Sequence, residues 1–501
     1  MKPTLNHIVV VGGGSAGWMT AAVLSKALNP AEISITLVES DQIGIVGVGE
    51  ATIPDMLQLN LFLGLAEDEL MKATQATFKL GIEFVDWARK GDRYFHPFGF
   101  HGVDIDGIDF HQYWLHSRAG GNTRQIDDYC ATVRVARKNG FAFPDIEAPG
   151  TAPSFLRYAY HLDASLYARF LRNYAERRGV KRIEGKIDEV LQDGASGDIS
   201  GVKLEGGAVV EGNFFFDCSG FRSLLLEKKL GVEMIDWSHW LPCDRAIAVA
   251  SQHAGPLTPY TRSTARSAGW QWRIPTQQRT GNGHIYSSEF MNEDEATSIL
   301  LSGLDGEVIG SPRFIPFKTG HRRVCWEKNC IAVGLSSGFL EPLESTSLYL
   351  IRTGISRFID LFSDAATLGA RREEYNKEMQ VEFEQVRDLL VLHYSASERD
   401  DSPFWEHCRN MQIPDTLAQR IALFRESGRY VHRDGELFGR PSWVAVMLGQ
   451  HVLPETIDPA VAALPHAEVD RKLELIRNAF GDFAETVLPH AEVLARYCPA
   501  H

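Results

Sequence analysis

Several signals of common protein classes are missing from this sequence of 501 residues. No apolar run reaches the roughly 18 residues that a membrane-spanning helix needs, and the N-terminal segment shows no small-residue cleavage site of a secretory signal. Seven cysteines are scattered without a CxxC pair, which argues against a disulfide framework and against a zinc site. We therefore expect a soluble protein of the reducing cytoplasm, with no membrane partner and no bound metal.

Positive charge is also scarce. Lys and Arg number 51 against 65 Asp and Glu, for a net charge of −14, which argues against nucleic acid as a partner. Apolar residues make up 44% and charged residues 23%, a composition typical of globular proteins that excludes a largely disordered chain. No internal repeat, low-complexity tract or long linker interrupts the sequence.

The clearest local signal lies in the first 40 residues. Ile8–Val11 predicts a buried strand, residues 15–28 a helix, and residues 33–38 a second strand that ends at Glu39. This is a βαβ unit of the ordinary length. Its loop, Gly12–Gly17, carries the GxGxxG pattern between the first strand and the helix, which is typical of a dinucleotide site.

Each part of this loop has a physical task. Gly12 makes a tight turn, Gly14 lets a pyrophosphate approach the backbone, and Gly17 lets the helix pack closely on the strand. The helix N-terminus offers amide groups to the phosphates, and Glu39 can accept hydrogen bonds from the ribose hydroxyls. The alternative is a tight turn without a ligand. The pattern by itself does not separate FAD from NAD.

Two later segments favour FAD. Asp163 can cap a helix, and three strands are predicted near 186–192, 199–205 and 208–217, so that a β-meander ends at Asp217. A further apolar strand runs into Gly334. The segments at Asp217 and at Gly334 are placed like the second and third FAD contacts of single-body flavoenzymes. A second convincing GxGxxG is missing, so we expect the flavin to receive its electrons from outside.

From about residue 345 the sequence is mostly helical. The spacing of Leu348, Ile351, Ile355, Phe358 and Phe362 predicts one helix, and three more are predicted at 370–394, 415–426 and 468–496. We expect a core over 1–345, with interleaved substrate-side segments near 80–160 and 235–320, and a helical portion over 346–501 packed on that core.

The sequence resembles the flavin-dependent halogenases of the tryptophan-halogenase family, from the first strand to about residue 453. Five segments carry the resemblance. They are Gly12–Met19, Gly47–Pro54, the WxWxIP motif at Trp270–Pro275, Phe339–Thr346, and the stretch from His393-Tyr394 to Trp405. The implied fold is α/β: a single-body, Rossmann-like core of the flavin monooxygenase type, with a β-meander and a helical C-terminal portion.

The resemblance also implies a chemistry. A separate NAD(P)H-dependent flavin reductase supplies diffusible FADH2, and oxygen and a halide ion then give hypohalous acid at the flavin. The oxidant travels to a lysine beside a small aromatic substrate, which is halogenated by electrophilic substitution. The implied FAD-binding residues are Gly12, Gly14, Ser15, Ala16, Gly17, Glu39, Gly49, Ala51, Asp217, Gly334 and Leu335.

The family's two catalytic residues match Lys79 and Glu344. Lys79 lies between apolar residues and would hold hypohalous acid by a hydrogen bond or as a haloamine; the residues alone favour a surface lysine. Glu344 would position the oxidant or take the proton lost from the ring, although a carboxylate before a helix N-terminus can also serve the helix dipole. Ser345 is expected to be the N-cap of that helix.

The same turn offers a halide site. The amides of Thr346 and Ser347 are first-turn donors, and the corresponding amides bind chloride in the family. Ser347 replaces the usual glycine, which alters the pocket and the choice between chloride and bromide. Trp270 and Trp272 alternate in a predicted strand and so face one way, as flavin-side residues in the family or simply as core.

The substrate is expected to differ from free tryptophan. Tryptophan-specific members hold the amino acid with two adjacent tyrosines, a glutamate, a Phe-Trp pair and an asparagine. The comparable segment here, Arg429–Trp443, has one tyrosine and neither the pair nor the asparagine. We expect an electron-rich, indole-like aromatic that reacts at C3. Phe98 and His101 are candidates to stack on it, and both could equally be core residues.

Three alternatives remain open on the sequence. One is a tryptophan halogenase proper. Another is a flavin-dependent aromatic monooxygenase, against which Lys79, the WxWxIP motif and the missing nicotinamide domain all argue. The third is a flavin-binding sensor without catalysis, against which the retained Lys79 and Glu344 argue.

Overall fold

A computed structural model of the chain describes residues 5–42, 49–362 and 369–500. No helix in these ranges combines the length and the apolar composition that crossing a bilayer requires. The chain forms two compact units, each built from three separate stretches. The first unit comprises Met1–Gln75, Leu162–Ser238 and Phe317–Glu384, and the second comprises Ala76–His161, His239–Pro316 and Gln385–His501.

This division differs from the one expected from the sequence. The second unit contains most of the stretches near 80–160 and 235–320 in which interleaved substrate-side segments were expected. The boundary expected at residue 345 falls inside the last stretch of the first unit. The division into 1–345 and 346–501 stays a prediction.

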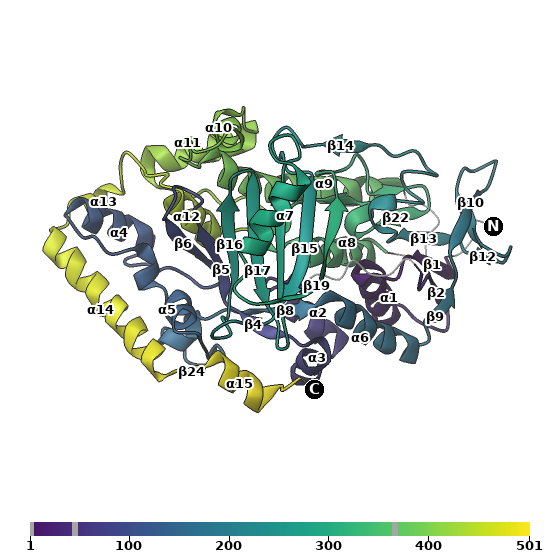
Figure 1. Cartoon of the computed structure of the whole chain (residues 1–501), viewed down its shortest axis with the longest axis horizontal. Helices are drawn as coiled ribbons and strands as arrows, with labels where there is room; N and C mark the ends of the chain where they lie inside the picture. The colour runs from purple at the N-terminus through teal and green to yellow at the C-terminus, as the bar shows by residue number, and fades with distance from the viewer. Residues whose placement is uncertain (1–4, 43–48, 363–368, 501) are drawn as a thin grey trace. The chain divides into compact units, whose positions relative to one another are not determined.

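The first unit is built on a six-stranded sheet that confirms the predicted βαβ unit (Figure 1). Parallel pairing joins β1 to both β2 and β13, β13 to β22, and β2 to β9, so the carboxyl ends of five strands meet at one edge. Helix α1 (Ser15–Ala27) connects β1 and β2. In spatial order the strands are β21 (Trp326–Glu327), β22 (Cys330–Ala332), β13 (Phe214–Asp217), β1 (His7–Val11), β2 (Ser34–Glu39) and β9 (Lys181–Glu184).

The predicted meander is present, with one correction. Strands β10 (Ile187–Gln192), β11 (Ile199–Leu204) and β12 (Val209–Glu211) form a separate antiparallel sheet. The single strand expected over 208–217 is wrong, because it is divided between this sheet and β13. At the division the Asn213 amide donates to the His7 carbonyl, so the chain leaves the meander and joins β1.

Helices cover the first unit's sheet. The predicted cap is confirmed: the Asp163 carboxylate accepts hydrogen bonds from the amides of Ser165 and Leu166 at the start of α6 (Ala164–Arg177). Helix α1 packs against α6 and against α8 (Ser347–Leu361), the helix predicted from the Leu348–Phe362 spacing. The remaining elements are β3 (Gly49–Ala51), α2 (Met56–Leu63), α3 (Glu67–Thr74), β14 (Met234–Asp236), β20 (Gly320–Arg322) and β23 (Gly338–Phe339).

The second unit is built on a seven-stranded sheet. Two central strands, β17 and β18, are buried along their whole length, and α7 (Glu293–Ser302) packs on β18 and β15 (Figure 1). In spatial order the strands are β19 (Val308–Pro316), β15 (Arg245–Ser251), β18 (Thr280–Tyr286), β17 (Gly269–Pro275), β16 (Thr261–Arg266), β5 (Gly81–Val85) and β6 (Arg93–Pro97).

Shorter elements complete this unit. Strand β4 (Thr77–Lys79) pairs antiparallel with β8 (Ala159–Asp163), and β7 (Gly140–Phe141) pairs antiparallel with β24 (Leu488–Pro489). Helices α4 (Phe110–Ala119) and α5 (Ala131–Arg137) lie against α14 (His466–Thr486).

The C-terminal region is mostly helical, as predicted. The helices expected at 370–394 and 415–426 are confirmed as α9 (Gly369–Ser395) and α11 (Asp415–Ser427). The others are α10 (Pro403–Asn410), α12 (Arg440–Gly449), α13 (Pro459–Ala462), α14 (His466–Thr486) and α15 (His490–Tyr497).

A single helix over 468–496 is therefore wrong. The chain is extended at Val487 and forms strand β24 before α15 begins. Pro489 explains the break, because proline has no amide hydrogen for a helical bond and disfavours helix at the residue before it.

Candidate active site

The glycine loop after β1 has the geometry that a dinucleotide needs. Gly12 has a φ of +113°, and a Cβ placed on it would overlap the Cys218 carbonyl oxygen. A Cβ on Gly17 would overlap the Gly12 carbonyl oxygen, so the helix and the strand approach as closely as predicted. A Cβ on Gly14, in contrast, would meet no atom within 4 Å. The backbone there faces open space at a helix N-terminus, which fits a bound pyrophosphate.

Glu39 lies directly against this loop, where its carboxylate blocks any side chain at position 13. One carboxylate oxygen accepts from Arg182 Nε at 2.5 Å, and the other accepts from Trp18 Nε1 at 3.3 Å. Arg172 forms a further ion pair with Glu39 at 3.6 Å. Glu39 is thus held in place by two arginines that no motif in the sequence had indicated.

Asp217 ties two loops together at the same sheet edge. Its side chain is fully buried, and both oxygens accept hydrogen bonds from within the protein. The donors are the amides of Ser219, Leu225 and Leu226 and the hydroxyls of Ser219, Ser223 and Ser336. The carboxylate therefore organises the loops after β13 and β22, and its contact with a cofactor stays a prediction.

The other predicted flavin-side residues lie in two further segments. Gly334 and Leu335 begin a short 3-10 turn after β22, and a Cβ on Gly334 would come within 2.8 Å of the Ala16 Cβ. Gly49 and Ala51 lie in β3. Between them burial raises the pKa of the Glu50 carboxyl to about 7. Gly47 and Val48, the first two residues of the family-like strap, lie outside the described residues.

Glu344 ends a 3-10 turn over Pro342–Glu344 and is buried. The N-cap of the following helix is Thr346, so the expectation of Ser345 in that position is wrong. Ser345 instead has a φ of +59°, and its amide donates back to the Pro342 carbonyl. This left-handed residue closes the turn, which moves the start of α8 one residue further along the chain.

The start of α8 carries a polar group that suits an anion. By position, Thr346 and Ser347 are the N-cap and the first helical residue, whose amides have no carbonyl partner within a helix. The Thr346 hydroxyl is buried and has no hydrogen-bond partner in the described part of the chain. A buried hydroxyl beside first-turn amides fits a bound halide.

Lys79 is fully buried, which rules out the surface lysine that the residues alone favour. It ends β4, where it lies opposite Ala159 of β8. Its ammonium lies 4.9 Å from the centre of the Phe98 ring. A buried ammonium over an aromatic face can donate hydrogen bonds to a small oxidant at a fixed place.

A neutral histidine that the sequence analysis missed lies near this lysine. Thr77 donates its only hydroxyl proton to the Pro275 carbonyl at 2.7 Å, so the contact of 3.1 Å to His161 requires Nδ1 of the imidazole to donate. His161 Nε2 then accepts from the Thr261 hydroxyl at 2.9 Å. Burial, together with the charge of Lys79, holds the pKa of His161 well below 6.5. A polar residue in a buried strand was the available signal.

The two predicted ring-stacking residues have different surroundings. Phe98 is half-buried and contacts Lys79; its stacking on a substrate stays a prediction. The His101 imidazole lies 3.2 Å from Asp127, which also pairs with Arg137 at 2.6 Å. The structure therefore gives His101 a place in an ion-pair network and brings only Phe98 to the lysine.

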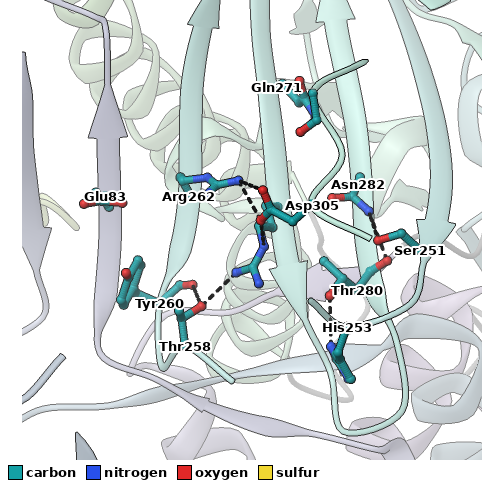
Figure 2. A network of polar contacts seen from close by, with 12 residues as sticks. Glu83, Ser251, His253, Thr258, Tyr260, Arg262, Gln271, Thr280, Asn282 and Asp305 are labelled. Carbon is teal, nitrogen blue, oxygen red and sulfur yellow. Dashed lines mark hydrogen bonds and ion pairs between the residues drawn. The ribbon is translucent and has the colours of Figure 1, made fainter. Parts of the chain in front are cut away.

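The two tryptophans of the WxWxIP motif lie in β17, as predicted, with ring centres 6.0 Å apart. Trp270 also lies 6.4 Å from Trp87 in a cluster of buried rings. Because side chains alternate along a strand, Arg273 projects from the opposite face. There it pairs with Asp305 at 2.8 Å. Arg262 also pairs with Asp305, at 2.9 Å (Figure 2). This network fastens the loop after α7 to the sheet.

The Arg429–Trp443 segment is organised around Glu436. Its buried carboxylate accepts from Arg420 at 2.7 Å, from the Arg433 amide at 2.9 Å and from the Tyr430 hydroxyl. The Arg420 guanidinium also lies 4.3 Å from the centre of the Trp443 ring. The buried acid of this segment, Glu436, is thus already paired with a cation of the protein.

A small pocket lies at this segment. It is lined by Gln385, Asp388, Arg420, Arg433, Glu436, Phe438 and Trp443. The Trp443 indole nitrogen and the Gln385 carbonyl oxygen are buried without a partner among the described residues. The Phe438 ring lies 6.2 Å from His96, two residues before Phe98 on the chain. The segment therefore adjoins the strand that leads to the lysine's aromatic neighbour.

Comparison with known proteins finds halogenases that match nearly the whole chain. The model of the tryptophan halogenase family matches residues 7–466. Tryptophan 6-halogenase SttH from Streptomyces toxytricini is 34% identical, and the match covers 98% of both chains. No group of residues suited to a metal ion is found in the described ranges, and all seven cysteines are buried.

Solved structures agree with the sequence matches. Xcc4156, a flavin-dependent halogenase from Xanthomonas campestris, is 45% identical with a TM-score of 0.96, and the match covers 100% of this chain and 99% of that one. BrvH, a flavin-dependent halogenase from Brevundimonas sp. BAL3, is 44% identical with a TM-score of 0.95 over 99% of both chains. The predicted α/β fold class is confirmed. The chain belongs to the tryptophan halogenase family of flavin-dependent halogenases, enzymes that use FAD and a halide.

Proposed function

We propose that this flavin-dependent halogenase acts on an electron-rich, indole-like aromatic at C3 and prefers it to free tryptophan. The observation that carries the proposal is the pairing of Glu436 with Arg420 in the segment that would otherwise grip an amino acid. Family membership favours this function over an aromatic monooxygenase or a flavin-binding sensor.

In this proposal the glycine loop and the adjoining sheet edge hold FAD. The open backbone at Gly14 and the fixed carboxylate of Glu39 support this assignment. Bound reduced FAD supplies oxygen with the electrons that make it able to oxidise halide to hypohalous acid. The proposed contacts are Gly12, Gly14, Ser15, Ala16, Gly17, Glu39, Gly49, Ala51, Gly334, Leu335 and the loop that Asp217 organises.

The chain's own residues then bind the halide and direct the oxidant. Thr346 and Ser347 hold the halide through their amides, and the buried Thr346 hydroxyl adds a third donor. Lys79 holds hypohalous acid by a hydrogen bond or as a haloamine, so that the halogen reaches the ring at a fixed place. Glu344 positions the oxidant or accepts the proton that the ring loses on substitution.

Phe98 supports the choice of an aromatic substrate. A half-buried ring whose centre lies 4.9 Å from the Lys79 ammonium can stack on a flat substrate beside the halogen donor. An amino-acid ammonium, by contrast, needs an acceptor once it leaves water, and Glu436 is already paired with Arg420. When no protein group binds the amino-acid part of the substrate and orients its ring, the intrinsic reactivity of indole selects C3.

A second candidate is a tryptophan halogenase proper. The relatives named as tryptophan 6-halogenases are 34% identical to this chain over nearly its whole length. Glu436 and Trp443 keep a carboxylate and an indole in the relevant segment, so this candidate must be tested directly.

The test is a competition between equimolar indole and tryptophan. The protein is supplied with FAD, a flavin reductase, NADH, oxygen and bromide, and products are separated by position of the halogen with mass spectrometry. Excess methionine, which consumes free hypohalous acid, keeps reaction in solution from counting as catalysis. We expect 3-bromoindole as the main product. Halogenation of tryptophan on its six-membered ring as the main product would instead establish the second candidate.

The same assay tests the electron source. Family members typically receive FADH2 from a flavin reductase. With the reductase omitted, we expect NADH or NADPH to leave the flavin oxidised and the aromatic unchanged. Reduction of the flavin by nicotinamide in the absence of a reductase would contradict this part of the proposal.

A further inference from the structure

The strand that carries Lys79 is short and is held on its two edges in different ways. Strand β4 has three residues, and β8 pairs with it on one edge. The central residue of β4, Phe78, donates its amide to Nε2 of the His490 imidazole at 3.1 Å. A side chain from the start of α15 therefore takes the place of a neighbouring strand beside the lysine.

His490 is itself fixed at three points. Its Nδ1 donates to the Leu257 carbonyl at 3.1 Å, and its own amide donates to the Asn139 carbonyl at 2.7 Å. An imidazole that donates from Nδ1 and accepts at Nε2 is neutral. Burial lowers the pKa of His490 to about 4, which keeps this acceptor available at neutral pH.

The aromatic packing around Phe78 joins the same elements. Its ring stacks on Phe141 of β7 with centres 3.8 Å apart, and the rings of His490 and Tyr497 of α15 lie 6.1 Å and 6.2 Å away. Strand β7 in turn pairs with β24, immediately before α15. Phe78 of β4 is thus held by α15 in two ways, through a backbone hydrogen bond and through ring contacts.

A third contact begins at the other end of the lysine strand. The Gln277 amide donates to the Ala76 carbonyl at 2.7 Å and to the Cys498 carbonyl at 3.0 Å. Its carbonyl oxygen accepts from the Ala500 amide at 2.8 Å. Gln277 therefore bridges the residue before β4 and the residues after α15.

We propose that His490 is a positioning residue for Lys79: by accepting the Phe78 amide it fixes β4, and with it the ammonium that directs the halogen. The inference rests on the proposed role of Lys79. His490 does not touch the reacting atoms; it acts through the backbone of β4. The α15 segment, far from Lys79 in sequence, is then part of what makes halogen transfer efficient.

The test compares two substitutions at one position. His490→Phe keeps a flat ring but removes the acceptor, whereas His490→Gln can accept from Phe78 and donate to Leu257 with one amide. We expect His490→Phe to lower the yield of haloindole per reduced flavin oxidised by about tenfold to a hundredfold, the usual cost of misplacing a reacting group. His490→Gln should restore most of that yield. FAD affinity and the rate of flavin oxidation should be unchanged in both variants.

A matched control separates positioning from general damage to the core. His284 is also fully buried, has a pKa lowered to about 4 by burial, and donates from Nδ1 to a carbonyl, that of Ala296. It lies in β18, and its hydrogen bond runs to Ala296 of α7 and not to β4. We expect His284→Phe to keep the wild-type yield per flavin oxidised. An equal loss in His284→Phe would overturn the proposal.

A second measurement does not depend on catalysis. The FAD-free protein is treated with a small amine-acylating reagent, and labelling of Lys79 is followed by mass spectrometry of its peptide. We expect Lys79 to be labelled several-fold faster in His490→Phe than in the wild type, with His490→Gln close to the wild type. Equal labelling in all three proteins would refute the positioning role. If labelling changes as expected but Lys79→Ala still halogenates, the fault lies in the proposed function instead.

Discussion

The guanidinium of Arg420 lies 2.7 Å from the carboxylate of Glu436, and both side chains are less than a tenth exposed. The same guanidinium lies over the rings of Tyr430 and Trp443, at 5.2 Å and 4.3 Å from their centres. Arg420 is thus paired with the carboxylate of Glu436, which could otherwise bind the ammonium group of a ligand. Removing the cation should change both the stability of the protein and its choice of substrate.

We predict that Arg420→Gln lowers the free energy of unfolding by about 3–5 kcal/mol, because it leaves a buried carboxylate without its cation. In the folded variant, the ratio of kcat/KM for tryptamine to that for indole should rise, since Glu436 can then pair with the ligand's ammonium. Arg429→Gln, which removes an exposed arginine of the same segment, is the control. An unchanged ratio in folded Arg420→Gln would show that Glu436 does not face the substrate.

Lys79→Ala should abolish halogenation while flavin chemistry continues. We expect haloindole formation to fall by at least about a hundredfold, because the oxidant is no longer held beside the ring. FAD binding, measured by fluorescence quenching, and consumption of oxygen should stay near the wild-type values. Near wild-type halogenation by the alanine variant, with methionine present as scavenger, would be incompatible with the assignment.

The first turn of α8 should control the halide. Thr346→Val keeps the side-chain volume but removes the buried hydroxyl, so we expect the KM for bromide to rise about tenfold or more, as for other hydrogen bonds to charged groups. Ser347→Gly keeps the amide and should raise the chloride-to-bromide ratio of products. Steady-state rates at varied halide concentration measure both effects. Wild-type halide dependence in Thr346→Val would place the halide elsewhere.

His490 should also leave a signature in the pH dependence of stability. Its folded-state pKa of about 4 lies below the unfolded value of 6.5, so the unfolded chain binds the proton first as the pH falls. The contribution of the neutral imidazole is complete above pH 6.5 and is lost between pH 6.5 and 4, by up to about 3 kcal/mol. Chemical denaturation of the wild type and of His490→Gln should therefore converge or cross over this range. Parallel curves would mean that His490 titrates normally.

Local patterns accounted for the first unit's nucleotide loop. The Gly12–Gly17 turn, helix α1 and the strand ending at Glu39 follow from residues that are neighbours in sequence, and the structure confirms them. The same holds for the Asp163 cap. Errors arose where the chain changes partners, as at Asn213 between two sheets and at Pro489 between α14 and α15. Pro489 predicts a break in the helix, but the helical spacing of the residues around it favours one continuous helix.

The candidate site was less accessible to local reasoning. The residues around Lys79 are apolar on both sides, which does not distinguish an exposed lysine from a buried one; its burial depends on β8, Phe98 and α15, all distant in sequence. Arg420 and His490 belong to no motif and were found only through their contacts. The donors to Asp217 come from two loops that lie far apart in sequence, so the network around this carboxylate does not follow from local patterns.

The docking of α15 beside the lysine strand also sets an order of events during protein synthesis. The last stretch of the first unit ends at Glu384, so all of that unit leaves the ribosome well before His490 is translated. Domains generally form as their chain emerges. The glycine loop can therefore be complete while β4 still lacks the partner on its second edge. Under the proposed function, a prematurely terminated chain without α15 would keep the loop proposed to bind FAD but lack the contact that fixes Lys79. It would then release hypohalous acid that no residue directs to a substrate.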